Sequence, residues 1–168
     1  MKISNNFKTE WDLSVFYKNE KDPQIEKDIK STEKAVDAFE KKYKNKDFTS
    51  SPKKLLQALK DDENLSKIIG DNKASRYFYF RKDLNSEDNV ATAELTKIEN
   101  RLTTAFNKIV FFSVSLSKIP PKNQKIFLKD NSLKPYRYFL KKVFDSSKYV
   151  LTEKEEQVIG LLSNTSYT

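Results

Sequence analysis

The chain has only two glycines, Gly70 and Gly160, among its 168 residues. Glycine adopts the positive φ angles of tight hairpin turns more readily than other residues, so a sheet built from such turns would lack its usual turn residues. The glycine-rich loops that hold nucleotide phosphates need several glycines close together, so two distant glycines exclude them. The scarcity of glycine therefore favours helices and argues against a nucleotide-binding domain.

The first half of the chain shows helical spacing after two start signals. At Asp22-Pro23 and again at Ser51-Pro52, a residue suited to an N-cap precedes a proline at the first helical position. The stripe after the first signal has steps of four and three: Ile25, Ile29, Thr32, Val36, Phe39 and Tyr43. The stripe after the second begins with Leu55, Leu56 and Leu59. We expect a turn or kink at Asp61-Asp62-Glu63, after which the helical pattern resumes and continues past Gly70.

The second half of the chain contains one more long helical pattern and several short ones. From Ser86 onward, apolar residues recur at steps of three and four: Leu95, Ile98, Leu102, Ala105, Ile109, Phe112 and Leu116. Residues 110–116 are rich in β-branched and aromatic residues, as strands are, but they keep the helical spacing. We therefore predict an unbroken helix that ends before Pro120-Pro121. Shorter helices are predicted to begin at Pro121 and Pro135.

A last helix is predicted from Thr152, because Thr152-Glu153-Lys154-Glu155 fits a capping box. Its apolar residues are Val158, Leu161 and Leu162. This stripe has no later segment to pack against, whereas natural domain boundaries usually fall in polar linkers. We expect that this helix is truncated and that the chain is a fragment of a larger protein.

Together these patterns predict an all-α fold of long antiparallel helices in a bundle-like or layered domain. We divide it into an N-terminal segment (1–21), long helices (22–118) and shorter helices (121–168), built around one core. We expect Trp11 to be partly buried and to anchor the N-terminal segment against the first long helix.

The chain has no histidine and no cysteine, which excludes most of the residues of zinc, thiol and serine-triad chemistry. The carboxylates of Asp61-Asp62-Glu63 and Glu153-Glu155-Glu156 lack the spacing of a calcium loop, and we assign both clusters to the first turns of helices. No catalytic, cofactor-binding or metal-binding residue is predicted in this chain.

The net charge of +8 raises the possibility of a nucleic-acid partner. Only four of the 32 basic residues are arginines, and the lysines alternate with acids, as on solvated helix faces. Two segments mix aromatic and basic residues, 76–82 and 136–139, and we expect their rings to be buried. The longest apolar run, 109–112, is too short to span a bilayer. We therefore predict a cytoplasmic chain with neither nucleic acid nor membrane as a partner.

Two blocks of the sequence resemble one protein family. Trp11-Asp12-Leu13-Ser14-Val15-Phe16-Tyr17 resembles the "WDLS…Y" opening of oligoendopeptidase F and related oligopeptidases of the thimet type, and Phe39-Glu40-Lys41-Lys42-Tyr43 is similar to the "F…KY" segment that follows it. Residues 136–140 and 151–156 resemble the family's "Y…YL…LS..EE" region, in the same order and with the same spacing.

The resemblance implies a zinc metallopeptidase that hydrolyses short oligopeptides, of which this chain would be the N-terminal helical portion. Zinc is then expected in the full-length parent, on a His-Glu-x-x-His helix of its own C-terminal catalytic domain, and no cofactor is expected in this chain. The helices present here would wall the substrate channel and would not be catalytic. Two alternatives are a stand-alone helical protein-interaction module without enzymatic activity and a weak, non-specific nucleic-acid binder.

Overall fold

The computed structural model describes residues 11–165, and within that range the chain is built of helices and connecting loops, with no strand. The α-helices are α1 (Pro23–Tyr43), α2 (Pro52–Gly70), α3 (Lys73–Leu84), α4 (Asn89–Asn107), α5 (Val110–Ser117), α6 (Pro121–Lys129), α7 (Arg137–Ser146) and α8 (Glu153–Thr165). Three 3-10 helices join them: η1 (Leu13–Val15), η2 (Asn131–Tyr136) and η3 (Ser147–Tyr149). The predicted all-α class is confirmed.

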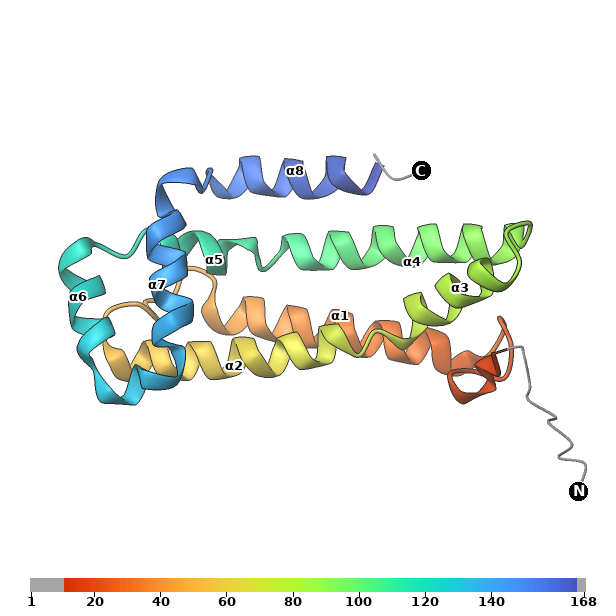
Figure 1. Cartoon of the computed structure of the whole chain (residues 1–168), viewed down its shortest axis with the longest axis horizontal. Helices are drawn as coiled ribbons and strands as arrows, with labels where there is room; N and C mark the ends of the chain where they lie inside the picture. The colour runs from red at the N-terminus through yellow and green to blue at the C-terminus, as the bar shows by residue number, and fades with distance from the viewer. Residues whose placement is uncertain (1–10, 166–168) are drawn as a thin grey trace, which may run out of the picture.

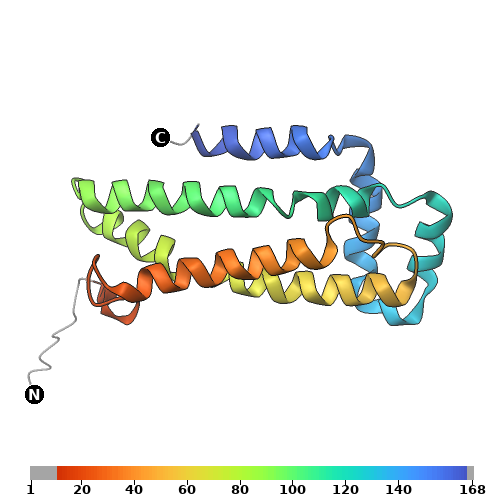
Figure 2. The same ribbon diagram turned by 180° about the vertical axis from the view of Figure 1, so that it is seen from behind.

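The long helices run alternately in opposite directions along one axis (Figures 1 and 2). Helix α1 contacts α2 on one side and α4 on the other, and α8 lies against the outer side of α4 and α5. Helix α3 continues in the direction of α2 and packs on α4. The short segments α6, η2 and α7 close one end of this layered array.

Helix α1 forms as the sequence predicts. The Asp22 side chain accepts a hydrogen bond from the N–H of Gln24, and Pro23 occupies the first helical position. All six residues of the predicted stripe are buried. The helix ends before Asn45, which has a positive φ of 59° and opens the loop to α2.

Helix α2 departs from the prediction in where it is interrupted. Asp61-Asp62-Glu63 lies in the middle of an uninterrupted helix, so the turn predicted there is wrong. The helix ends at Gly70, where we predicted that it would continue. Asn72 then caps α3 by accepting a hydrogen bond from the N–H of Ser75. The break therefore falls where a capping side chain supplies an acceptor, and Asn72 lies nine residues after Glu63.

The predicted unbroken helix from Ser86 to Leu116 is also wrong, although its helical character is right. Helix α4 ends at Asn107, and α5 begins after Ile109, whose backbone angles are φ −105° and ψ 1°. The adjacent residues Phe111 and Phe112 are both buried, so α5 buries more than one face. No side-chain hydrogen bond caps the start of α5, and the break has no local signal in the sequence.

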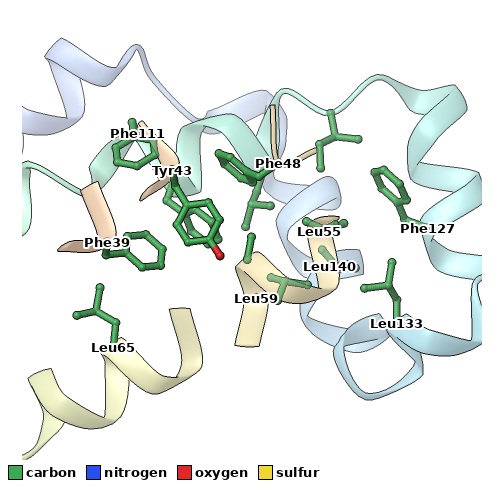
Figure 3. Close-up of a cluster of buried hydrophobic side chains, with 14 of the residues drawn as sticks. Phe39, Tyr43, Phe48, Leu55, Leu59, Leu65, Phe111, Phe127, Leu133 and Leu140 are labelled. Carbon is green, nitrogen blue, oxygen red and sulfur yellow. The ribbon is translucent and has the colours of Figure 1, made fainter. Parts of the chain in front are cut away.

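The buried side chains form two neighbouring clusters. The larger one joins the C-terminal half of α1 to α2, α5, α6, η2 and α7; Figure 3 shows it around Phe39, Tyr43, Phe48, Leu55, Leu59, Leu65, Phe111, Phe127, Leu133 and Leu140. The second joins the N-terminal half of α1 to α3 and α4. Phe106 packs against both clusters, which makes the array continuous.

Tyr17 is the residue that anchors the N-terminal segment to α1. Its side chain is buried, its hydroxyl donates a 2.8 Å hydrogen bond to Asp28 on α1, and its ring packs edge-on against Tyr77. Trp11 is 60% exposed and its ring contacts Phe80 of α3, so the anchoring role predicted for Trp11 is wrong. Its partner is on a different helix from the one expected.

Replacing Tyr17 with phenylalanine is expected to lower the free energy of unfolding by about 1–2 kcal/mol, because a carboxylate loses a buried donor while the ring is retained. Burial and the bond to Asp28 raise the pKa of Tyr17, so the donor stays protonated at neutral pH. Urea denaturation measures the change. Tyr149→Phe is the matched control, since that exposed ring should tolerate the change within about 0.5 kcal/mol. Equal effects of the two substitutions would refute the anchoring role.

Candidate functional site

Exposed large apolar side chains are concentrated on α7, η3 and α8, and we call this set of residues the α7–α8 surface. It consists of Tyr138, Phe139, Tyr149, Leu151, Val158, Ile159, Leu161 and Leu162. The exposure is substantial, reaching 74% for Tyr149 on η3 and 62% for Leu162 on α8. Gatherings of exposed apolar side chains on soluble proteins commonly mark contact sites.

The opposite side of α8 meets the helical array through polar groups. The Gln157 side-chain amide donates a 2.9 Å hydrogen bond to the carbonyl oxygen of Asn107, and the Asn107 amide donates one of 3.3 Å to the carbonyl of Gln157. Gly160 permits this approach, because a Cβ there would lie 2.8 Å from the Asn107 Oδ1 atom. Helix α8 thus turns polar residues inward and apolar residues outward, the reverse of an ordinary surface helix.

The start of α8 is held by the predicted capping box. The Thr152 N–H and hydroxyl donate hydrogen bonds of 2.8 and 2.7 Å to the Glu155 carboxylate, and the Glu155 N–H donates to the Thr152 hydroxyl at 3.4 Å. The Glu156 carboxylate also accepts from the N–H of Leu151. The placement of the second acidic cluster in a first helical turn is confirmed.

Thr152→Ala is expected to weaken α8 by about 1 kcal/mol and to speed hydrogen exchange of its amides about fivefold, leaving α4 unaffected. Hydrogen bonds from Thr152 lower the pKa of Glu155. The contribution of Glu155 is therefore present at neutral pH and is lost as the pH falls through that lowered pKa. Lys154→Ala, an exposed change in the same turn, is the control. Unchanged exchange in Thr152→Ala would contradict the capping role.

A second feature is a groove of about 330 Å³, which we call the Asp62 groove. Its lining consists of Asp62 from α2, Phe106 from α4, Ile109 from the break after α4, Val110, Phe112, Ser113 and Leu116 from α5, and Phe139 and Val143 from α7. Apart from Asp62 and Ser113 these residues are apolar. The groove therefore presents a single carboxylate in apolar surroundings.

The three consecutive acids of α2 occupy three different environments. Asp61 accepts from the Tyr43 hydroxyl and pairs with Lys42. Glu63 accepts a 2.7 Å hydrogen bond from the Tyr136 hydroxyl, which raises the pKa of Tyr136 to about 12. Asp62 has no hydrogen-bond or ion-pair partner among residues 11–165, and its burial raises its pKa. The assignment of this cluster to the first turn of a helix is wrong, because α2 begins at Pro52.

Our reading of the sequence missed the Asp62 groove, although one signal for it was present. Asp62 lies three residues after Leu59 and three before Leu65, both of which are buried. An acid at the apolar position of a helical stripe is unusual and could have marked the position. The walls of the groove depend on how α5 and α7 pack, which no local pattern reveals.

The residues present do not fit a zinc site. The sequence supplies neither histidine nor cysteine, and within the described range no group of three or more acidic side chains is placed to hold a metal ion. Zinc chemistry cannot be assigned to side chains of this chain.

The two mixed aromatic and basic segments differ in burial. In α3, Tyr77 and Phe78 are buried as predicted, whereas Tyr79 is 53% exposed, so the prediction holds for only part of that segment. In α7, Tyr138 and Phe139 are exposed, so the prediction of buried rings is wrong there. Helix α7 buries a narrow face that carries Leu140 and Phe144, and the other rings point away from it.

Two of the four arginines are engaged by carboxylates of the same chain. Arg101 on α4 pairs with Glu26 and Glu33 on α1, at 2.7 and 3.0 Å, and Arg81 pairs with Asp88 at 2.7 Å. These guanidinium groups connect helices. In the part of the chain that the structure describes, no helix is long and apolar enough to cross a membrane.

Comparison with known protein families relates the end of the chain to peptidases. Residues 116–168 match the oligopeptidase F family. The match confirms the resemblance to the N-terminal region of oligoendopeptidase F-like peptidases over α6, η2, α7 and α8. It includes the block at 136–156, whereas the block at 11–17 lies outside it. Searches of curated proteins and of solved structures found no match.

Proposed function

We propose that this chain is the N-terminal helical portion of an oligoendopeptidase F-like zinc metallopeptidase that hydrolyses short oligopeptides in the cytoplasm. The observation that carries the proposal is the oligopeptidase F match at residues 116–168. The α7–α8 surface, Tyr138 to Leu162, lies entirely within the matched range. Its apolar side chains suit a contact with another part of the same protein.

In this proposal the chain encloses the substrate, and the parent's own C-terminal catalytic domain carries out the hydrolysis. The catalytic domain packs on the α7–α8 surface and carries the zinc. The helical array walls the substrate channel, which admits short peptides and excludes folded proteins by size. The sequence contains no histidine and no cysteine. This is consistent with the proposed division, in which the histidine ligands of the zinc belong to the catalytic domain.

The test is peptide hydrolysis with and without the α7–α8 surface. We expect no hydrolysis of a quenched fluorescent peptide by the 168-residue chain, with or without added Zn²⁺. In the full-length parent, the double change Leu161→Ser and Leu162→Ser is expected to lower kcat/KM at least about tenfold by disturbing the domain contact. Val90→Ser, an equally exposed apolar position on α4, is the control. Peptide cleavage by the chain alone, or a parent indifferent to the double change, would contradict the proposal.

A further inference from the structure

Asp62 occupies a position on α2 where the helical spacing of the neighbouring buried residues calls for an apolar side chain. Leu55, Leu59 and Leu65 share its side of the helix, and all three are buried. Its two acidic neighbours point elsewhere and have partners, Asp61 with Lys42 and Glu63 with Tyr136. Asp62 is therefore the acid of this cluster that faces the apolar groove.

Nothing within the groove balances the charge of Asp62. The lining residues include no lysine or arginine. Besides Asp62, the one polar side chain among them is that of Ser113, whose hydroxyl carries no charge. The cations beside the neighbouring acids are already paired, Lys42 with Asp61 and Lys67 with Glu63, and the Tyr136 phenol is neutral at neutral pH. A carboxylate removed from water without a cation is costly, and a bound cation would offset that cost.

The apolar walls of the groove indicate which kind of cation would fit beside Asp62. Phe106, Val110, Phe139 and Val143 offer apolar surface from three helices, and 330 Å³ lies at the small end of the range of ligand pockets. A hydrated metal ion would find one carboxylate and one hydroxyl among the lining side chains, fewer oxygen ligands than such an ion takes. An organic ammonium with a compact apolar group matches both the charge and the walls.

We propose that the Asp62 groove binds a small amphipathic ammonium, a primary amine on an aromatic or branched apolar group, with the amine paired to Asp62 and the apolar group held between α5 and α7. The amine can come from a free organic amine or from the N-terminal residue of a short peptide. The site does not depend on the proposed peptidase function, since all of its residues belong to this chain.

The test is a titration of the ¹⁵N-labelled chain followed by NMR. Phenethylamine is expected to shift amide signals of α5 and α7 saturably at pH 7. Phenethyl alcohol, which has nearly the same shape without the charge, is expected to bind at least about tenfold more weakly. Asp62→Asn is expected to weaken phenethylamine binding by a similar factor, whereas Asp83→Asn, the same charge change at an exposed position of α3, leaves it unchanged.

A second arm identifies the source of the amine. Binding of the tripeptide Phe-Gly-Gly, lost on N-acetylation, assigns the groove to peptide N-termini, whereas binding of phenethylamine alone assigns it to free amines; both outcomes support the proposal. Binding of phenethylamine is further expected to weaken as the pH falls through the pKa of Asp62. Equal binding of the amine and the alcohol, unchanged binding in a folded Asp62→Asn chain, or no saturable shift with either amine would overturn it.

Discussion

Replacing Phe78 with alanine is expected to lower the free energy of unfolding by about 3–5 kcal/mol, the largest effect that we predict for a single substitution. Phe78 is fully buried in the second cluster, where α1, α3 and α4 meet, and its ring packs edge-on against Tyr77. Removing the ring leaves a cavity that three helices must close together. Chemical denaturation followed by circular dichroism measures the change.

Tyr79 provides a matched control one position along the same helix. Its ring is 53% exposed, so Tyr79→Ala should cost far less than Phe78→Ala, about 1 kcal/mol or below. Comparable losses for the two substitutions would mean that α3 does not present Phe78 to the core as described. A large loss for Tyr79 alone would reverse the assignment of the buried and exposed faces of this helix.

Asp62→Leu is expected to raise the free energy of unfolding by about 1–2 kcal/mol at neutral pH, an increase where most substitutions cause a decrease. Leucine would continue the apolar stripe of α2 and contact the walls of the Asp62 groove. It would also remove a half-buried carboxylate without a partner. Sites kept for binding commonly retain residues that cost stability.

The pH dependence identifies the cause of that increase. Burial raises the pKa of Asp62, so its favourable contribution to folding is present below the unfolded-state pKa and is lost as the pH rises through the folded-state pKa. The advantage of Asp62→Leu over the wild type should therefore shrink in acid. Asp83→Leu on the exposed side of α3 is the control and should change stability by no more than about 0.5 kcal/mol at any pH. Destabilisation by Asp62→Leu would show that the carboxylate is not held in apolar surroundings.

The parts of the fold that follow from local rules were predictable. An N-cap, a proline and a regular stripe define α1, and the capping box defines the start of α8, because each signal lies within one or two helical turns. The interruptions were not predictable in the same way. The acids at 61–63 suggested a turn because acids favour helix starts. The break lies instead between Gly70 and Lys73, where Asn72 caps the next helix. The break at Ile109 has no such signal, because the apolar residues keep their helical spacing from Leu102 to Leu116 and no side chain caps the start of α5.

The candidate sites divide along the same line. An apolar stripe at Val158, Leu161 and Leu162 was visible in the sequence, and the structure places these side chains on the surface. The Asp62 groove was not visible, since α2, the α4–α5 break and α7 supply its walls from positions up to 81 residues apart in the chain, from Asp62 to Val143. Residues so distant come together only through the packing of the end segments.

The most direct test of the proposed function is the reading frame that contains these 168 codons. If the chain is the N-terminal helical portion of an oligoendopeptidase F-like peptidase, the frame continues in phase beyond Thr168 and encodes a His-Glu-x-x-His motif with a further glutamate ligand downstream. A frame that closes at Thr168, or one that continues without such a motif, would contradict the proposal and favour a stand-alone helical interaction module.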